Sequence, residues 1–405
     1  MNNQDNRRYS AQQCLQLSAC TNCQLCADVC PAVKASANGE LSALHRMKGL
    51  RQILRSRDKG LLSRLFRPRP MTDAQRKAYA ETVFRCTLCG NCQEVCPVGI
   101  GLKDLWISLR QDLVDIREFP KKINLIRDNL EESHNVFAED NEERTEWVED
   151  LDDPPDDLFV REKADVVYFT GCTAAFFPVA QKIPLAFTKI LLASETEFSL
   201  MGEDEWCCGF PLVGAGLKEA ADEFISHNIE AVLARGARQV VFSCPSCYEM
   251  WKEHYPYKKH GIEIFHSTQF LERLIVEKRI PLQPLDLTVT YHDPCDLGRG
   301  AREFDAPRRV IQAIPGLKFV ELPNNRDHCN CCGGGGNLEM IDADLATRIA
   351  ADKIDEALST GADAVVTSCQ QCVRTMLTYC KRNKIALQVM DITQLVQRAL
   401  EDGDE

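Results

Sequence analysis

The stretch "ADAVVTSCQQC" (residues 362–372) joins a short apolar, β-branched run to a pair of cysteines. Such a run predicts a buried β-strand, and the cysteines follow where the strand feeds a loop. The stretch "ARQVVFSCPSC" (237–247) repeats this pattern, and "ADVVYFTGC" (164–172) and "LTVTYHDPC" (287–295) each end a similar run with one cysteine. The C-terminal part of the chain therefore contains a repeat of strands that end in cysteine.

Helical stretches lie between these predicted strands. The segments 217–237 and 338–362 are both predicted helices, and both reach a glycine near their ends, which is a common helix stop. Strands that alternate with helices predict parallel sheets. We therefore expect two repeated α/β domains, with the cysteines at the strand ends where such folds place their sites.

Composition narrows the functional classes. The chain has 405 residues, 21 of them cysteine, and a net charge of −12, which disfavours nucleic acid as a partner. The start "MNNQDNRRYS" lacks the apolar core of a signal peptide, and no run reaches the roughly 18 apolar residues of a membrane span. We expect a cytoplasmic protein without a transmembrane segment, held at the inner face of a membrane only through a partner. In that compartment, patterned cysteines indicate metal ligands or redox groups.

Two N-terminal motifs share the spacing C-x-x-C-x-x-C-x-x-x-C-P. They are "CTNCQLCADVCP" (20–31) and "CTLCGNCQEVCP" (86–97), and this spacing is the bacterial ferredoxin signature. In that arrangement three thiolates of one motif hold one cluster and the fourth ligates the other cluster. We predict two cubane [4Fe–4S] clusters, one held by Cys20, Cys23, Cys26 and Cys96, and one held by Cys86, Cys89, Cys92 and Cys30. A pair of zinc sites is the alternative, although zinc ligands usually come as C-x-x-C pairs.

Two further cysteine sets obey one formula: a lone cysteine, a Cys-Cys-Gly, and a C-x-x-C pair. The first set is Cys172, Cys207, Cys208, Cys244 and Cys247, and the second is Cys295, Cys331, Cys332, Cys369 and Cys372. Five soft ligands exceed the four that a zinc ion or a cubane takes. Adjacent cysteines suit two neighbouring irons, so each set predicts a cluster that requires more sulfur than a cubane.

Glycines follow both Cys-Cys pairs, most densely in "HCNCCGGGG" (328–336). Gly209, Gly333 and Gly334 are predicted to bind the cofactor, because glycine adopts positive φ and lets the backbone approach a cluster closely. Gly335 and Gly336 are interpreted as a plain turn.

The paired formula resembles the CCG domains of heterodisulfide reductase. Two ferredoxin motifs followed by two CCG domains resemble the D subunit of that enzyme, and also the iron–sulfur subunits of glycolate oxidase and of anaerobic glycerol-3-phosphate dehydrogenase. The resemblance covers essentially residues 14–395. Those dehydrogenase subunits often lack part of the first CCG motif, whereas both copies are intact here, which favours the disulfide reductase.

The resemblance implies one noncubane [4Fe–4S] cluster on each five-cysteine set. The two clusters would together reduce a disulfide to two thiols, with electrons arriving from the ferredoxin-type clusters. A flavoprotein or a membrane cytochrome b subunit would be the electron donor or acceptor. The alternative is a relay subunit, without substrate chemistry, of a flavin-dependent dehydrogenase or an electron-transfer-flavoprotein complex linked to quinone. The chain has no G-x-G-x-x-G after a strand, so we expect no flavin in it.

A few residues beside the second set are candidates for catalysis. His292 and Asp293 are expected either to supply a proton or hydrogen bond, or to pack at a strand end. Arg299 is a candidate for contact with an anionic substrate. Cys14, Cys329 and Cys380 fall outside the four sets and are expected to be free thiols, of which Cys329 is nearest to a predicted cluster.

The predicted domain order follows from these motifs. We expect an α-helical ferredoxin domain at 1–130, an acidic linker at 131–160, a first CCG domain at 161–283 and a second at 284–405. Within the first domain, residues 45–70 form a basic, partly amphipathic segment that suits a membrane surface, an acidic partner or simply solvent.

Overall fold

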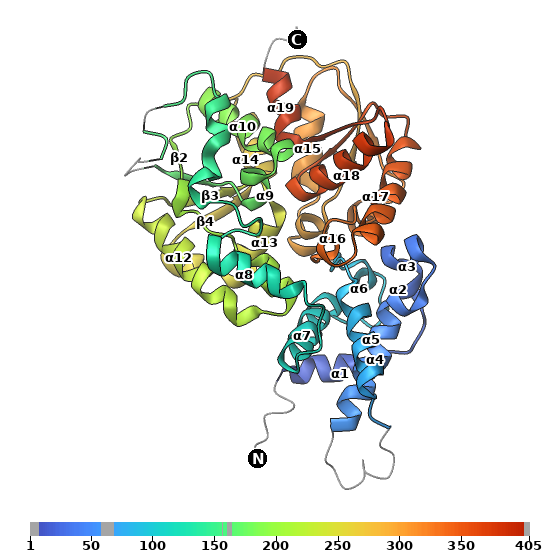
Figure 1. Cartoon of the computed structure of the whole chain (residues 1–405). Coiled ribbons are helices and arrows are strands. Elements are labelled where there is room, and N and C mark those ends of the chain that lie inside the picture. Colours follow the sequence, from blue (N-terminus) through green and yellow to red (C-terminus); the bar gives the residue numbers. More distant parts are fainter. Residues whose placement is uncertain (1–7, 58–68, 156, 160–163, 401–405) are drawn as a thin grey trace. The chain divides into compact units, whose positions relative to one another are not determined.

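The computed structural model describes residues 8–57, 69–155, 157–159 and 164–400. Part of the basic segment, residues 58–68, lies outside the described residues. The chain divides into two compact units, shown together in Figure 1. Unit 1 comprises Met1–Ile126, Pro211–Lys218 and Gly333–Ile349, and unit 2 comprises Arg127–Phe210, Glu219–Cys332 and Ala350–Glu405.

Unit 2 contains two four-stranded sheets with the same topology. Their strand orders are β2-β1-β3-β4 and β6-β5-β7-β8, and every pair is parallel. The strands are β1 (Val166–Phe169), β2 (Phe198–Leu200), β3 (Gln239–Phe242), β4 (Glu263–His266), β5 (Thr288–His292), β6 (Lys318–Glu321), β7 (Ala364–Thr367) and β8 (Gln388–Asp391). This repeat confirms the prediction of two α/β units with parallel sheets.

The strand order places the cysteine loops at a favourable position. In each sheet the second strand pairs with one edge of the first strand, and the third strand pairs with its other edge. The strand order therefore reverses between β1 and β3 and between β5 and β7. Ligands of open parallel sheets bind at such a switch point, beyond the carboxyl ends of the strands. Phe169 pairs with Phe242, so the loops that carry Cys172 and Cys244 leave the sheet side by side.

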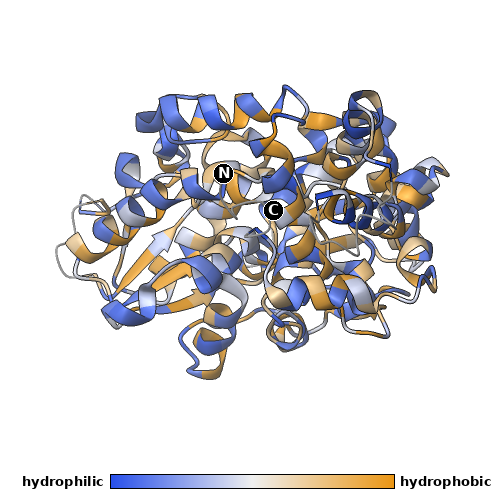
Figure 2. Ribbon diagram, turned by 90° about the horizontal axis from the view of Figure 1, so that it is seen from below, coloured by the Kyte–Doolittle hydropathy of each residue, from blue (hydrophilic) through white to orange (hydrophobic). Residues whose placement is uncertain are grey.

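Helices surround these sheets in unit 2 (Figure 1). They are η2 (Asn141–Asp150), α9 (Cys172–Phe176), α10 (Pro178–Ala193), η3 (Gly202–Asp204), α12 (Ala221–Ala234), α13 (Pro245–His254), η5 (Tyr257–His260), α14 (Ser267–Val276), η6 (Asp296–Gly300), α15 (Asp305–Ala313), η7 (Arg326–His328), α18 (Gln370–Asn383) and α19 (Ile392–Leu400). One buried cluster includes Tyr168 and Val241 of the first sheet and Tyr291 and Val366 of the second. The two sheets therefore share a hydrophobic core, and the strands carry mostly hydrophobic colours in Figure 2.

The acidic segment predicted as a linker carries packed structure. It contains η2, and Trp147, Val148 and Leu151 join the core of unit 2. Burial of a tryptophan and two aliphatic side chains contributes several kcal/mol, at about 1.5–3 kcal/mol for each large apolar side chain. This segment is therefore part of the fold of unit 2 as well as a connection.

Unit 1 is helical. Its elements are α1 (Ala11–Ala19), α2 (Leu25–Asp28), α3 (Pro31–Ser36), η1 (Gly39–Leu41), α4 (Ala43–Arg57), α5 (Asp73–Phe84), α6 (Asn91–Glu94), α7 (Leu102–Asp115) and α16 (Leu338–Ile341). The elements that run from one unit into the other are α8 (Ile123–Ser133), α11 (Phe210–Ala215), η4 (Lys218–Ala220) and α17 (Ala343–Leu358). Ser10 and Thr72 begin α1 and α5 with capping boxes. The prediction of an α-helical ferredoxin domain is confirmed.

Among the residues that the structure describes, none of the helices combines the length and the apolar composition needed to span a membrane.

Asp391 gives the fold a pH dependence that can be measured. This carboxylate is 1% exposed at the end of β8, and its Oδ1 accepts hydrogen bonds from Thr393 N and Oγ1, at 2.9 and 2.8 Å. Burial raises the pKa of Asp391 from 3.8 to about 7, although the Thr393 hydrogen bonds lower it. Because the folded pKa exceeds the unfolded one, the resulting stabilisation is complete below about pH 4 and is lost as the pH rises through 7.

We therefore expect Asp391→Asn to remove this loss, because the amide keeps the cap without titrating. Between pH 4 and 8 the wild type should lose a few kcal/mol of unfolding free energy relative to the variant, since one pKa unit corresponds to about 1.4 kcal/mol. Anoxic urea unfolding of both proteins across this range measures the difference. Parallel pH profiles for the two proteins would show that Asp391 is ionised in the folded state.

Candidate metal centres

The first predicted cubane set lies around one cavity in unit 1. Cys20, Cys23, Cys26 and Cys96 line it, together with Leu44, Met47, Ile100 and Leu102. Burial, and then the charges of the other three thiolates, raise the pKa of Cys26 to about 11. Cys23 is exposed and the other three are half-buried. Four convergent thiols in an apolar cavity fit a [4Fe–4S] cubane.

The second predicted cubane set is more deeply buried. Burial, and then the charges of Cys86, Cys89 and Cys30, raise the pKa of Cys92. Cys30 and Cys89 are buried, and the other two are half-buried. Asn91 of the second motif donates to Val29 O of the first at 3.4 Å, next to Cys30. The fourth cysteine of each motif thus lies with the first three of the other, and the donor set again fits a cubane.

The two ferredoxin motifs share an unusual backbone. The second residue after Cys20 and after Cys86 has positive φ, at 57° in Asn22 and 54° in Leu88. The fourth residue does the same, at 72° in Gln24 and 76° in Gly90. Only one of these four positions is glycine, so three residues hold a conformation that costs about 1 kcal/mol or more each. This left-handed geometry recurs at matching positions of the two motifs, and the sequence composition did not predict it.

A buried arginine accompanies the second cubane set. Arg46 is 1% exposed and donates to Leu41 O at 2.8 Å and to Thr82 O at 3.3 Å. Burial lowers the pKa of Arg46, but the charges of Cys86, Cys30 and Cys92 outweigh this and raise it. The guanidinium therefore compensates part of the thiolate charge.

Arg110 fixes the loop of the second ferredoxin motif in unit 1. Its guanidinium is fully buried and donates to Val83 O, Phe84 O, Cys86 O, Gly214 O and Gly336 O at 2.7–3.3 Å. Gly214 and Gly336 belong to the two segments that follow the Cys-Cys-Gly motifs along the chain. Both segments are thus bound to the loop that carries Cys86.

The glycines that follow the second Cys-Cys pair allow closer backbone contact than a plain turn requires. Gly336 has a φ of +63°, and a Cβ there would lie 2.3 Å from Cys86 O. A Cβ on Gly335 would lie 2.7 Å from Thr87 O. The interpretation of both as a plain turn is therefore wrong, because each is needed for close backbone contact.

The glycines predicted to bind the cofactor differ among themselves. Gly209 and Gly333 have positive φ, at 88° and 94°, whereas Gly334 is not among the positive-φ glycines. A Cβ on Gly333 would lie 2.6 Å from Ala346 O, and one on Gly209 would lie 3.2 Å from Ala221 Cβ. Close packing against helices accounts for the first two, and contact of all three with a cofactor stays a prediction.

The first five-cysteine set is continuous in unit 2. All five thiols are buried, and hydrogen-bonding contacts link them in the order Cys172, Cys207, Cys208, Cys247, Cys244. A Cβ on Gly171 would lie 3.3 Å from Cys247 Sγ, so this glycine (φ +82°) lets the loop after β1 approach the set. Five connected thiols are a donor set suited to an iron–sulfur cluster that takes more cysteine ligands than a cubane.

A buried ion pair supports the first set. Arg144 Nη1 donates to Glu205 Oε1 at 2.8 Å, and Arg144 Nη2 donates to Cys172 Sγ at 3.7 Å. Glu205 also accepts from the backbone N–H groups of Thr170 and Gly171, at 2.7 and 2.8 Å. Burial lowers the pKa of Arg144, but the charges of Glu205 and Cys172 outweigh it. The pair therefore orients the loop after β1 and places a positive charge beside Cys172.

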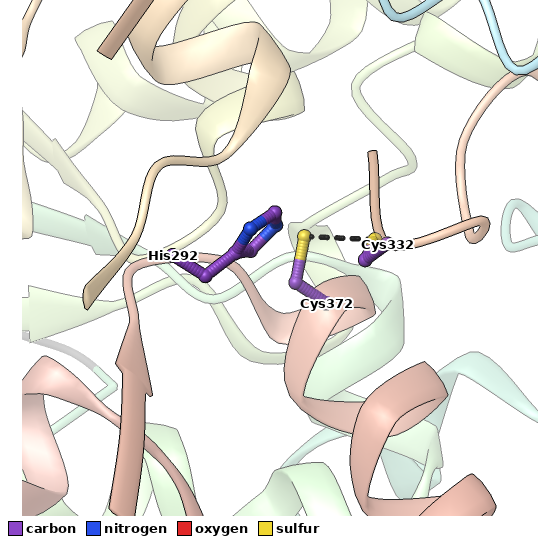
Figure 3. A group of neighbouring side chains, drawn as sticks. All are labelled: His292, Cys332 and Cys372. Atoms are coloured by element: carbon purple, nitrogen blue, oxygen red, sulfur yellow. Dashed lines mark hydrogen bonds between the residues drawn. The ribbon is translucent and has the colours of Figure 1, made fainter. Parts of the chain in front are cut away.

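The second five-cysteine set surrounds His292. Cys332 and Cys372 are in contact at 3.2 Å between their sulfurs, and contacts extend to Cys331 and Cys369. A nitrogen of His292 and the sulfurs of Cys332 and Cys372 all lie within 4.8 Å of one another, and Figure 3 shows the ring directed toward the sulfurs. Cys295, the fifth predicted ligand, is half-buried next to η6. Ligation of a cluster by these five cysteines stays a prediction.

Cys329 adjoins the second set. It is fully buried, with its Sγ 3.4 Å from His292 Nδ1 and 3.6 Å from Lys353 Nζ. Lys353 is also fully buried and donates to Glu356 Oε2 at 2.5 Å. Each five-cysteine set thus has one buried cation with a glutamate partner, Lys353 here and Arg144 at the first set.

The other two catalytic candidates bind protein groups. Arg308 holds Asp293 through two hydrogen bonds of 2.8 and 2.9 Å. Arg299 donates to Asp327 O at 3.1 Å and to Cys329 O at 2.7 Å, and it is 7% exposed. These contacts favour structural roles for both residues, whereas His292 faces the sulfurs of Cys332 and Cys372.

The two five-cysteine sets lie close to each other. A hydrogen bond from Cys372 lowers the pKa of Cys369, but burial and then the charge of Cys244 outweigh it and raise this pKa to about 11. Ser246, inside the first C-x-x-C pair, donates to Asp296 Oδ2 at 2.6 Å, and Asp296 follows Cys295. The C-x-x-C pairs of both copies therefore border one region of unit 2.

Comparison with known proteins agrees with this geometry. The family model "4Fe-4S dicluster domain" matches residues 16–100, and "Cysteine-rich domain" (CCG) matches residues 166–252 and 289–377. The D subunit of the dihydromethanophenazine:CoB–CoM heterodisulfide reductase of Methanosarcina acetivorans is 36% identical over 98% of this chain and 97% of its own length. That of Methanosarcina barkeri is 34% identical over 98% and 97%. The EtfAB:quinone oxidoreductase of Syntrophomonas wolfei is 25% identical over 80% of this chain and 47% of its own length.

The fold and the donor sets define an iron–sulfur oxidoreductase subunit with a ferredoxin-type dicluster domain and paired cysteine-rich domains. More specifically, the chain belongs to the family of heterodisulfide reductase D subunits.

Proposed function

We propose that this chain reduces a disulfide formed by two different thiols, such as the CoB–CoM heterodisulfide named for its relatives. The balanced reaction converts the disulfide, two electrons and two protons into two thiols. The observation that carries this proposal is the presence of two complete five-cysteine sets whose C-x-x-C pairs border the same region. A disulfide has two sulfurs, and two adjoining metal centres match that symmetry.

The proposed cofactors are two cubane [4Fe–4S] clusters and two noncubane [4Fe–4S] clusters. When bound, they supply one-electron transfer and iron sites that accept sulfur. The two ferredoxin-type sets would hold the cubanes, and the two five-cysteine sets would hold the noncubane clusters. The donor chemistry supports this division, since four thiols suit a cubane and five adjoining thiols suit a cluster richer in sulfur.

The residues around the five-cysteine sets have complementary roles in this proposal. Arg144 and Lys353 offset thiolate charge at the first and second sets, and both are buried, where an unpaired charge is costly. His292 is directed at Cys332 and Cys372, so it can donate a hydrogen bond to a sulfur there. Such outer-sphere contacts typically change metal affinity or activity by about 10–100-fold.

Electrons would enter at the first ferredoxin-type set. Cys23 is exposed, and Leu25 and Val98 at the same cavity are 45% and 40% exposed, whereas the second set contains two buried cysteines. A partner protein, either a flavoprotein or a membrane cytochrome b subunit, would exchange electrons there. We propose that residues 1–130 form the ferredoxin domain, 131–160 the acidic linker, 161–283 the first CCG domain and 284–405 the second.

The direct test is anoxic reduction of the CoB–CoM disulfide by the cluster-loaded chain with a reduced viologen dye as donor. We expect consumption of two dye electrons for each disulfide cleaved. A loaded protein that takes electrons from the dye but never cleaves a disulfide would instead support the relay function. The similarity to the EtfAB:quinone oxidoreductase favours that second candidate, for which a quinone analogue is the acceptor to assay.

A further inference from the structure

Gln370 makes contacts that its counterpart in the first repeat cannot make. It follows Cys369 in the second C-x-x-C pair, where the first pair has Pro245 after Cys244. Gln370 is 0% exposed at the start of α18. Burial of a polar amide costs free energy unless its hydrogen bonds are made. Its partners therefore indicate why the residue is there.

All partners of the Gln370 amide that the structure describes belong to the first repeat. Nε2 donates to Thr170 O at 2.7 Å and to Ser243 Oγ at 2.8 Å, and Oε1 accepts from Ala174 N at 3.1 Å. Both amide hydrogens and the oxygen are thus used.

These partners are the segments that carry the first five-cysteine set. Thr170 and Ala174 flank Cys172 at a distance of two residues along the chain, and Ser243 directly precedes Cys244. Gln370 therefore binds two of the three cysteine-bearing segments of the first repeat, those of Cys172 and Cys244, from within the second C-x-x-C pair.

A reciprocal contact runs in the opposite direction. Ser246, within the first C-x-x-C pair, donates to Asp296, the neighbour of Cys295 in the second repeat. Each C-x-x-C pair thus holds the ligand loop of the other repeat, but Gln370 does so through three hydrogen bonds. Neither contact follows from the internal repeat, since position 245 is proline and position 246 aligns with Gln371.

We infer that Gln370 is a positioning residue that sets the separation and orientation of the two five-cysteine sets. This inference rests on the proposed function, because a disulfide has a fixed S–S length of about 2.05 Å and both of its sulfurs must meet their centres together. A misplacement of about 1 Å in a reacting geometry typically costs about 100-fold in rate. Gln370 reaches no substrate in this role and acts through the cysteine loops.

The test compares Gln370→Met with Gln371→Met in the cluster-loaded chain. Met has nearly the volume of Gln but neither donates nor accepts as an amide does. Gln371 is the matched control, since it lies in the same C-x-x-C pair and its Nε2 bonds Thr375 of its own helix. Pulsed EPR of the reduced protein measures the magnetic coupling between the two centres, and iron content shows whether both are present.

We expect Gln370→Met to retain its iron, to change the coupling between the two centres, and to lower kcat for disulfide reduction by about 10–100-fold. Gln371→Met should leave coupling and kcat near wild type. Unchanged coupling in Gln370→Met, or equal changes in both variants, would overturn the inference.

Two further outcomes separate this inference from the proposed function. A change in coupling without disulfide turnover in any protein would support the positioning role and refute the reductase. Wild-type turnover and coupling in Gln370→Met would refute only the positioning role. If Gln370→Met does not load with iron, Ser243→Ala removes one acceptor of the Gln370 amide more mildly, and unaltered coupling there would overturn the inference.

Discussion

Serine in place of two cysteines of either five-cysteine set is expected to abolish disulfide reduction. The informative variants are Cys208→Ser/Cys247→Ser in the first set and Cys332→Ser/Cys372→Ser in the second, because the thiols of each pair are in contact. We expect each to lose more than about 100-fold in turnover, beyond the 10–100-fold typical of outer-sphere changes. The EPR signals of the ferredoxin-type clusters should persist, since those ligands lie in the helical unit.

Cys380→Ala is the matched control for these variants. Cys380 is buried in α18, the same helix that carries Cys372, but it belongs to none of the four sets. It should keep turnover near wild type. If one of the double variants retained half of the wild-type turnover, a single five-cysteine set would suffice for disulfide reduction. The hypothesis that two centres cleave the disulfide together would then be wrong.

The largest effect on stability is expected for Arg110→Met. This change removes the donor for five backbone carbonyls, which include Cys86 O and Gly336 O. A buried acceptor left without a partner costs about 1–3 kcal/mol, so a loss of at least about 3 kcal/mol is expected. The iron of the second ferredoxin-type cluster should be lost with it, because the guanidinium holds the loop that carries Cys86. Anoxic thermal unfolding and iron analysis measure both effects.

Arg51→Met serves as the control for Arg110→Met. Arg51 donates to Leu17 O and Cys20 O at the first ferredoxin motif, but it is only half-buried. We expect a smaller loss of stability, confined to the first cluster. Equal effects of the two substitutions, or full iron content in Arg110→Met, would contradict the role assigned to Arg110.

The sequence predicts the repeated fold well, because the repeat depends on local patterns. Apolar runs such as 364–367 become buried parallel strands, and the ferredoxin spacing groups Cys96 with Cys20 across a long insertion. Short-range spacing places the first three thiols of each ferredoxin motif together, whereas the exchange of the fourth thiol is a property of the ferredoxin signature. The resemblance to the D subunit of heterodisulfide reductase adds the family, which the comparisons confirm.

The supporting residues could not be predicted in the same way. Arg110 and Gln370 bind backbone groups that are up to 226 and 200 residues away along the chain. Every residue has a backbone carbonyl, so the sequence does not indicate which carbonyls will accept from a distant side chain. The buried roles of Arg110 and Gln370 therefore could not be predicted. The stretch around Trp147 resembles a linker in the sequence because many of its residues are acidic, and only a few apolar side chains, such as Trp147 and Val148, are buried in the core.

Iron and acid-labile sulfide per chain, measured on anoxically prepared protein, test the central claim that each five-cysteine set holds a cluster. Four clusters of the [4Fe–4S] type require about 16 iron atoms in the wild type and about 12 in each double-serine variant. About 8 iron atoms in the wild type, unchanged in both variants, would mean that only the ferredoxin-type sets bind clusters, which would contradict the claim.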